Sequence, residues 1–208
     1  MNDRMSPTPC DHEHLAELSE ALGRFGRCVD VLDRWGVRLA AVLENGGRLL
    51  AAGNGGSAAQ AQHLTAELVG RYRSDRSPYS AICLSSETST LTAITNDYPP
   101  GELFARQVEA HGREGDVLVL MSTSGQSENV VEAARRGRAR GLEVWAMTGP
   151  VPNPLAAEAT EYCAVDAPYT ATVQELHLVG LHILCAALDR TLDVGVSRTR
   201  RSIEDVAV

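Results

Sequence analysis

The chain has 208 residues, a hydrophobic fraction of 44% and a formal net charge of −8, which suits one globular domain with a full core. The negative charge argues against general nucleic-acid binding, which needs a basic surface. No apolar run approaches the roughly 18 residues that a membrane span needs. Because no apolar signal core follows Met1 either, we expect a cytoplasmic protein without a membrane partner.

All 19 basic residues are arginines, which excludes chemistry that depends on a lysine. A Schiff base needs a lysine amine, and a Walker-type phosphate site needs a lysine after its glycines. The five cysteines form no Cys-x-x-Cys pair, so we interpret them as reduced residues that pack in the core.

Helical and strand-like segments alternate along the chain. A helical segment over residues 1–45 comes first, with apolar residues at helical spacing from His14 to Leu43 and glycines at 23, 26 and 36 that weaken or kink it. Residues 46–193 form the main domain, and residues 194–208 form a polar tail that we expect to be flexible.

Within the main domain, five apolar segments read as strands, at 48–52, 80–84, 116–121, 143–147 and 162–165. The helices are predicted at 57–69, 87–96, 101–111, 128–140, 154–159 and 173–192. This order predicts a single α/β domain with a parallel sheet, flanked by helices on both faces and preceded by an N-terminal helical extension.

Two of these strands run into loops rich in glycine and hydroxyl groups, and each loop opens a helix. The loops are Gly53–Ser57, with the sequence GNGGS, and Ser122–Ser127, with the sequence STSGQS. Ligands of open α/β sheets bind beyond the carboxyl ends of the strands, and a helix N-terminus holds anions well. The two loops therefore indicate a small phosphorylated ligand.

An imidazole and a carboxylate share one face of the helix after the first loop. His63 and Glu67 are four residues apart, about 40° from each other around the helix axis. Such a pair can bind one metal ion, act as acid and base, or form an exposed ion pair without a function. Its position just beyond a phosphate-type loop raises the weight of the two functional interpretations.

The last predicted helix carries Gln174 and His182. His182 lies in an apolar stretch, where an imidazole needs a partner, either a backbone carbonyl or a ligand. Gln174 precedes it by roughly 12 Å along the axis and about 80° around it, so the spacing leaves open whether both reach one ion. Asn96 and Asp97 end an earlier helix and either stop it or bind sugar hydroxyls.

Together these residues resemble the phosphoheptose isomerases of the sugar isomerase (SIS) domain superfamily. The resemblance runs from about Arg48 to Leu188 and keeps the two loops, the imidazole–carboxylate pair, the Asn–Asp step and the polar residues of the last helix in order. It implies an aldose–ketose isomerase that converts sedoheptulose 7-phosphate into glycero-manno-heptose 7-phosphate through an enediolate. It also implies a homo-oligomer, a tetramer in this family, in which the N-terminal helical segment packs.

The resemblance further implies roles for individual residues. Glu67 matches the general base and His182 matches the acid, while the serine-rich loop would hold the phosphate. The metal, usually zinc, would be bound by His63, Glu67, Gln174 and His182. The substrate contacts would be Asn54, Gly55, Gly56, Ser57, Glu67, Asn96, Asp97, Ser122, Thr123, Ser124, Ser127 and Gln174.

The chain departs from the family pattern at three places. Thr172–Val173 stands where arginine and isoleucine are frequent, Pro150–Pro154 replaces a glycine-rich stretch, and Gln126 stands where asparagine is frequent. The first two departures bear on substrate choice.

The alternative function is that of a non-catalytic SIS-domain protein that associates with the bacterial replication initiator. That relative lacks the second histidine of the last helix, whereas this chain keeps His182. The enzyme is therefore the favoured interpretation, and metal content with turnover of sedoheptulose 7-phosphate discriminates between the two.

Overall fold

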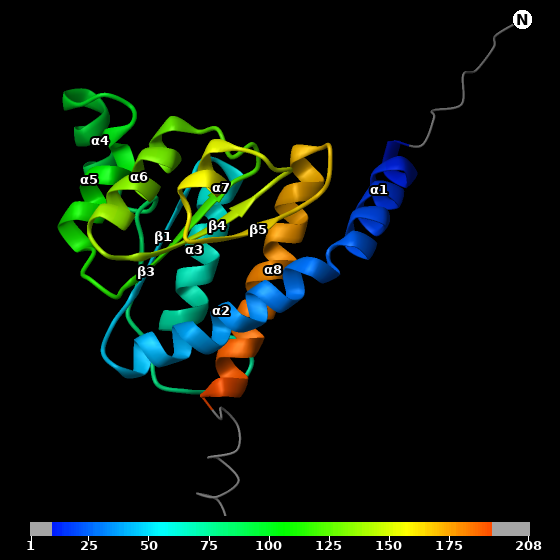
Figure 1. The fold of residues 1–208 in the computed structure, drawn as a ribbon, viewed down its shortest axis with the longest axis horizontal. Helices are drawn as coiled ribbons and strands as arrows, with labels where there is room; N and C mark the ends of the chain where they lie inside the picture. The colour runs from blue at the N-terminus through cyan, green and yellow to red at the C-terminus, as the bar shows by residue number, and fades with distance from the viewer. Residues whose placement is uncertain (1–9, 193–208) are drawn as a thin grey trace, which may run out of the picture.

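Five parallel strands form one sheet at the centre of the computed structural model, which describes residues 10–192 (Figure 1). The strand order is β2-β1-β3-β4-β5. The strands are β1 (Leu49–Gly53), β2 (Ala81–Cys83), β3 (Val117–Ser122), β4 (Glu143–Thr148) and β5 (Glu161–Ala164). The helices are α1 (Cys10–Arg24), α2 (Gly26–Glu44), α3 (Gly56–Val69), α4 (Thr88–Asp97), α5 (Glu102–His111), α6 (Glu128–Ala139), α7 (Pro154–Glu158) and α8 (Thr170–Thr191).

These elements confirm the predicted α/β fold. Every strand and helix predicted between residues 48 and 192 is present, and its ends differ from the prediction by at most three residues. All four strand pairs are parallel, as the near-continuously apolar strands require. The predicted tail, 194–208, lies outside the described residues.

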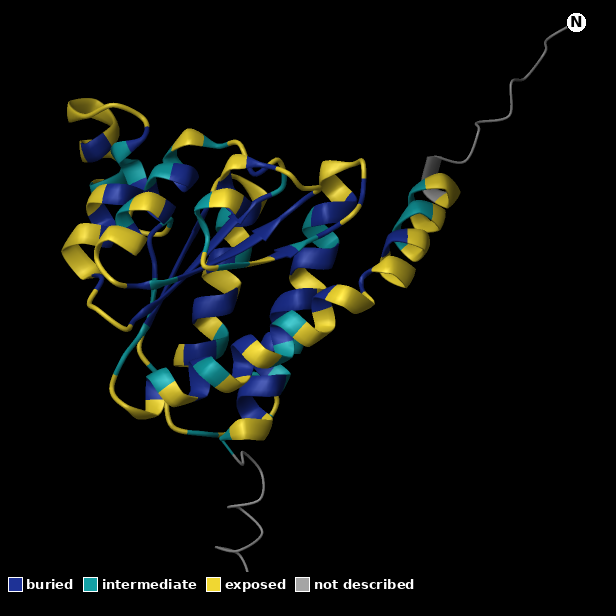
Figure 2. Ribbon diagram, in the orientation of Figure 1, coloured by how far each residue is buried: buried dark blue, intermediate teal, exposed yellow. Residues whose placement is uncertain are grey.

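The strand side chains alternate between two cores, one on each face of the sheet. In β1, Leu49 and Ala51 belong to the first core, while Leu50 and Ala52 belong to the second. Helices α2, α3 and α8 cover the first core, and α5, α6 and α7 cover the second. The central strands are therefore buried while the outer faces of the helices are exposed (Figure 2).

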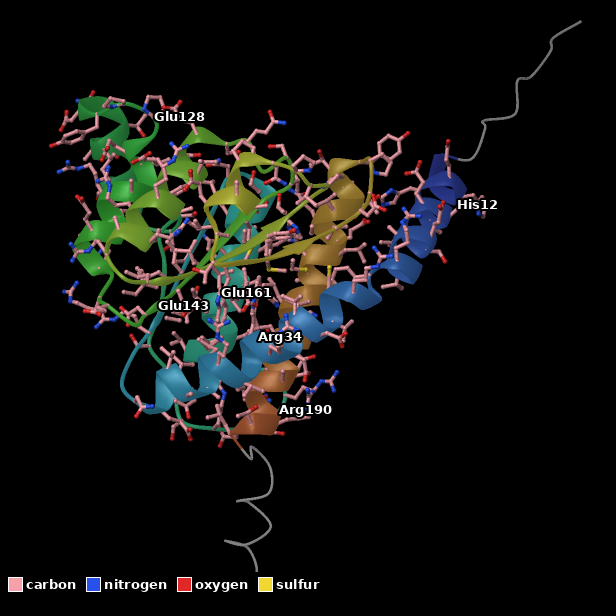
Figure 3. The ribbon with its side chains drawn as sticks, viewed as in Figure 1. His12, Arg34, Glu128, Glu143, Glu161 and Arg190 are labelled. Carbon is pink, nitrogen blue, oxygen red and sulfur yellow. The ribbon has the colours of Figure 1, made fainter. Side chains whose placement is uncertain are left out.

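Helix α2 belongs to the first core together with the sheet. Its Trp35 stacks on Trp145 of β4 with ring centroids 4.9 Å apart, and both rings are fully buried. Trp35 also donates a hydrogen bond to Glu161 at 2.8 Å, and Arg38 donates one to the same carboxylate at 2.5 Å. Figure 3 shows Glu161 beside α2. The N-terminal helical segment and the main domain thus share one hydrophobic core.

The N-terminal helical segment divides into two helices at Phe25, between two of the glycines that were predicted to weaken it. The third, Gly36, does not break α2. A Cβ at this position would lie 2.8 Å from the backbone nitrogen of Leu188 on α8. Gly36 therefore lets α2 and α8 approach each other closely.

Helix α8 is long and apolar enough, by length and composition alone, to cross a membrane. The sequence prediction counted no such segment, because polar residues such as Gln174 and His182 interrupt its apolar run. In the structure, 56% of the apolar window is buried inside the protein, against α2, α3 and the sheet. We interpret α8 as the central core helix of the domain.

The cysteines pack as expected. The four whose side chains the structure describes are free and buried: Cys28, Cys83, Cys163 and Cys185.

Candidate active site

The two glycine- and hydroxyl-rich loops lie side by side at one edge of the sheet. Gly53, at the end of β1, is the register partner of Met121 in β3, and the second loop begins at the next residue. The strand order also reverses between β1 and β3. The chain continues from β1 to β2 toward one edge of the sheet, and from β3 to β4 toward the other edge. Open α/β sheets bind their ligands at such a switch point.

A reciprocal pair of amide hydrogen bonds joins the two loops. Asn54 donates to Asn129, and Asn129 donates back, each at 2.9 Å. Asn129 lies in the first turn of α6, two residues beyond Ser127. The sequence prediction included Asn54 but missed Asn129. The signal that could have identified Asn129 was its position directly after the second loop.

A side chain from α8 covers the first loop. The amide of Gln174 lies against Gly56, since a Cβ on Gly56 would come within 2.5 Å of its Nε2 atom. Gln60 of α3 donates to the backbone carbonyl of Gln174 at 2.5 Å, and Ser57 is only 4% exposed. Gln174 thus packs on the first turn of α3, and its parts in substrate and metal binding stay predictions.

The second loop presents hydroxyls at the start of α6. Ser122 Oγ lies 3.2 Å from Ser127 Oγ and accepts a hydrogen bond from the N–H of Gly125 at 3.1 Å. The Ser127 side chain makes no hydrogen bond to the first turn of α6. The N–H groups of Val130 and Val131 donate to the Ser127 carbonyl, which leaves those of Glu128 and Asn129 available to an anion. The loop brings together all four predicted phosphate contacts: Ser122, Thr123, Ser124 and Ser127.

The proline-rich stretch Pro150–Pro154 braces this second loop. Asn153 caps the first turn of α7 and donates a hydrogen bond to the Thr148 hydroxyl at 3.1 Å. The N–H of Leu155 then donates to the carbonyl of Gly125 at 3.0 Å. The segment that departs from the family pattern therefore supports the backbone of the phosphate-type loop.

Within residues 10–192, one group of three side chains is arranged to hold a metal ion: His63, Glu67 and His182. The Nε2 atom of His63 lies 3.1 Å from Nε2 of His182 and 3.2 Å from Oε1 of Glu67. One ligand atom from each of the three residues lies within 4.8 Å of the others. The structure thus brings together three of the four predicted metal ligands.

The surroundings of Glu67 fit a cation at this position. Its side chain is 17% exposed, and its Oε2 atom is buried without a hydrogen-bond partner. A buried carboxylate oxygen without a partner is unfavourable unless a proton or cation satisfies it. Two imidazole nitrogens and a carboxylate oxygen are a typical donor set for zinc, so the residues present fit this ion.

Asn96 and Asp97 end α4, as the sequence predicted, and both are exposed. Asn96 donates a hydrogen bond to Asp97 at 2.7 Å. In the described part of the chain, no hydrogen bond joins either side chain to the two loops. Their contact with a substrate stays a prediction.

The sequence prediction missed two residues in the segment after α3. The ring of Tyr72 stacks on the imidazole of His182 with centroids 5.5 Å apart. The Arg76 side chain, 5% exposed, donates to the carbonyl of Glu67 at 2.6 Å and pairs with Asp189 at 3.2 Å. Because Asp189 lies 113 residues further along the chain, no local pattern marks this contact.

His177 shares the motif of the last helix but lies in the core instead of the site. It is fully buried, and neither ring nitrogen makes a hydrogen bond of normal geometry. Burial lowers the pKa of His177 to about 4, and the nearby backbone of Thr148 opposes this shift only in part. The imidazole is therefore a neutral packing group at physiological pH.

The chain is similar to known proteins over most of its length. The sequence profile of the SIS domain matches residues 17–149. A phosphoheptose isomerase from Streptomyces coelicolor is 64% identical over 182 residues, which cover 88% of this chain and 79% of that protein.

Two solved structures are similar over most of their length. The phosphoheptose isomerase GmhA from Neisseria gonorrhoeae has a TM-score of 0.79 and 39% identity, covering 86% of this chain and 96% of that one. A phosphoheptose isomerase from Francisella tularensis has a TM-score of 0.81 and 31% identity, covering 86% of this chain and 96% of that one.

Proposed function

The chain belongs to the phosphoheptose isomerase family of SIS domain proteins and is an isomerase, and on that premise we propose that it converts sedoheptulose 7-phosphate into glycero-manno-heptose 7-phosphate. The convergence of His63, Glu67 and His182 beside two helix-opening loops carries this proposal. One part of the site offers acid–base groups, and the other offers hydroxyls and N–H groups that suit a phosphate dianion.

The proposed reaction moves a proton between adjacent carbons and needs no redox cofactor. In the open-chain ketose, Glu67 takes the proton from C1, the electrons of that C–H bond form the C1–C2 double bond, and the C2 carbonyl oxygen gains the negative charge. His182, which as the acid also assists ring opening, gives a proton to this C2 oxygen. The proton on Glu67 then returns to C2 and O1 gives its proton back to His182, which leaves an aldehyde at C1, a hydroxyl at C2 and both residues in their starting states. A positioned base of this kind contributes about 10²–10⁴-fold.

The second loop would bind the phosphate. Its predicted contacts include the exposed Ser124 and the half-buried Ser127, and the uncapped start of α6 adds backbone N–H groups. Hydroxyls and backbone groups are the donors to expect, because neither loop contains a basic residue.

Zinc is the proposed ion, held by His63, Glu67 and His182, with Gln174 completing the set. When bound, the ion stabilises negative charge on the enediolate oxygens. The three ligand atoms within 4.8 Å of one another and the unpartnered Oε2 of Glu67 support this assignment.

The test is incubation of the purified protein with sedoheptulose 7-phosphate, with and without a chelator, with the product identified by NMR. We expect the aldose heptose 7-phosphate to form, to be lost after chelation and to return when zinc is added. Elemental analysis should find one divalent ion per chain. A metal-loaded protein without turnover would contradict the proposal and favour the non-catalytic binding protein.

The assembly is proposed to be a homotetramer in which residues 1–45 pack against other copies. Leu15 and Leu22 of α1 are 60% and 50% exposed, and Val29 of α2 is 37% exposed. Leu15 and Leu22 lie seven residues apart on α1, the spacing at which the apolar positions of packed helices recur. Replacing Leu15 and Leu22 with glutamate should dissociate the assembly in sedimentation experiments, whereas a deletion would also remove Trp35 from the core. A wild-type protein that sediments as an active monomer would contradict this assembly.

We also propose a cytoplasmic location and no nucleic-acid partner. The four free, buried cysteines fit a reducing compartment, and the net charge of −8 disfavours binding to phosphate backbones. Cell fractionation and a DNA-binding assay at low salt test the two points.

A further inference from the structure

An aromatic ring from the segment that follows α3 contacts one of the candidate metal ligands. The ring of Tyr72 lies over the imidazole of His182, with centroids 5.5 Å apart and planes 27° from parallel. The guanidinium of Arg73 lies 5.0 Å from the centroid of the Tyr72 ring. Tyr72 is half-buried and also packs against the first core. The ring is thus held between the core and the imidazole that it contacts.

The backbone around Tyr72 is fixed by the buried side chain of Arg76. Its guanidinium donates to the carbonyls of Glu67 and Leu68, at 2.6 and 2.8 Å, and pairs with Asp189 of α8 at 3.2 Å. One arginine therefore ties the end of α3, the following segment and α8 together. This anchoring explains how a residue outside any helix or strand keeps a defined position.

The imidazole of His182 lacks the support that a metal-binding histidine usually has. Such histidines almost always donate their second ring N–H to a carboxylate or carbonyl, which fixes the ring orientation. In the described part of the chain, the one hydrogen bond of the His182 ring joins its Nε2 to His63. The ring of His63 meets this imidazole edge-on, with centroids 5.3 Å apart, and the ring of Tyr72 is the one stacked on its face. Stacking on the face is the contact suited to fix the plane of the His182 ring.

We propose that Tyr72 is a positioning residue, whose ring holds the imidazole of His182 in the orientation that faces His63 and Glu67. The expected effect of this positioning on zinc affinity rests on the proposed function. Outer partners of metal ligands typically contribute 10–100-fold to metal affinity, and we expect loss of the Tyr72 ring to cost an amount in this range. Because the stacking uses the ring and not the hydroxyl, phenylalanine should replace tyrosine.

The experiment compares Tyr72→Leu, Tyr72→Phe and the wild type, with Tyr162→Leu as a matched control. Tyr162 is 45% exposed on β5, so its replacement makes the same chemical change away from His182. The first readout is the ¹H–¹³C spectrum of histidine-labelled, metal-free protein, in which the ring current of Tyr72 shifts the His182 signal. The second is zinc affinity by chelator competition, and the third is kcat and KM with sedoheptulose 7-phosphate.

We expect Tyr72→Leu to move the His182 signal, to weaken zinc binding by about 10–100-fold and to lower kcat more than it raises KM. Tyr72→Phe and Tyr162→Leu should behave as the wild type. An unchanged His182 signal in Tyr72→Leu, or zinc affinity equal to that of the wild type, would overturn the inference. A wild type that binds no zinc would instead overturn the proposed metal site, and the metal-free spectrum would still decide whether the Tyr72 ring lies against the imidazole of His182.

Discussion

The two loops at the sheet edge have similar sequences but different surroundings. In the first loop, the amide of Gln174 covers Gly56 and the side chain of Ser57 is buried, so the protein's own atoms lie against the start of α3. In the second loop, Ser124 is exposed and Ser127 leaves the first N–H groups of α6 uncapped. Neither helix start has a side-chain cap, so the difference lies in the hydroxyls: an anion can reach those of the second loop, whereas Ser57 of the first loop is buried.

The helices behind the loops differ as well. Helix α3 carries His63 and Glu67, which meet His182. The position in α6 that corresponds to His63 is Arg135, which pairs with Glu158 at 3.0 Å on the protein surface. The helix after the first loop, α3, thus carries groups that can transfer protons. The helix after the second loop, α6, carries a surface ion pair at the corresponding position. We propose that the chemistry takes place on the α3 side of the site and that the phosphate binds on the α6 side. This division predicts different kinetic effects of substitutions on the two sides.

The largest effect is expected for Glu67→Gln, on the α3 side. Loss of a positioned base should lower kcat by about 10²–10⁴-fold or more, while the thermal unfolding midpoint stays close to that of the wild type. The exposed Glu44 at the end of α2 provides the matched control, Glu44→Gln, which should retain full activity. Near-normal turnover by Glu67→Gln would remove this carboxylate from the mechanism.

Gly56→Ala should have the next largest effect, because it displaces Gln174 from the first loop. The new Cβ would overlap the amide of Gln174, 2.5–2.8 Å away, and misplacement of a site residue by about 1 Å can cost on the order of 10²-fold in rate. Alanine is a better helix former than glycine, so activity should fall without a loss of stability. Gly23→Ala, where no atom lies within 4 Å of the added Cβ, is the control. An active Gly56→Ala enzyme would show that Gln174 has no role at this loop.

On the α6 side, Ser124→Ala should raise KM more than it lowers kcat, because phosphate binding is largely the same in the ground and transition states. A lost hydrogen bond to a charged group, about 1.5 kcal/mol, corresponds to a KM roughly tenfold higher. Ser86→Ala, in the loop after β2, removes a hydroxyl that bonds to the Cys83 carbonyl at 2.8 Å and should leave KM unchanged. A Ser124→Ala enzyme with unchanged KM would place the phosphate at Gly53–Ser57.

The last prediction concerns stability and leaves the activity unchanged. Burial lowers the pKa of His177 from 6.5 to about 4, so the unfolded chain binds a proton near pH 6.5 that the folded protein takes up only near pH 4. Stability should therefore fall as the pH drops through this window and level off below it. The loss is at most about 3.5 kcal/mol, because one pKa unit corresponds to about 1.4 kcal/mol. In urea unfolding between pH 7 and pH 4, His177→Leu should lose less stability than the wild type, and equal slopes would contradict this assignment.

Local patterns were enough to predict the elements and the loops. The central strands are continuous apolar runs bounded by polar segments, and the spacing of His63 and Glu67 fixes their common face without tertiary information. The strand order and the pairing of α3 with α8 are not local, so the convergence on His182 came from a family resemblance and not from spacing.

The residues that the sequence prediction missed depend on contacts between distant segments. Tyr72 and Arg76 lie in a segment with no periodicity, and their partners are on α8, more than 100 residues away. The hydrogen bonds between Asn129 and Asn54 depend on the two loops lying side by side, which the local sequence does not indicate. The position of Gln174 against Gly56 likewise depends on how α8 packs on α3.

The most direct test of the division between the two loops is a crystal structure of Glu67→Gln with sedoheptulose 7-phosphate, in which the substrate remains unconverted. We predict that the phosphate accepts hydrogen bonds from the Ser124 and Ser127 hydroxyls and from N–H groups at the start of α6. C1 and C2 should lie beside residue 67 and His182. A phosphate bound at Gly53–Ser57, with the reacting carbons away from α3, would contradict the account.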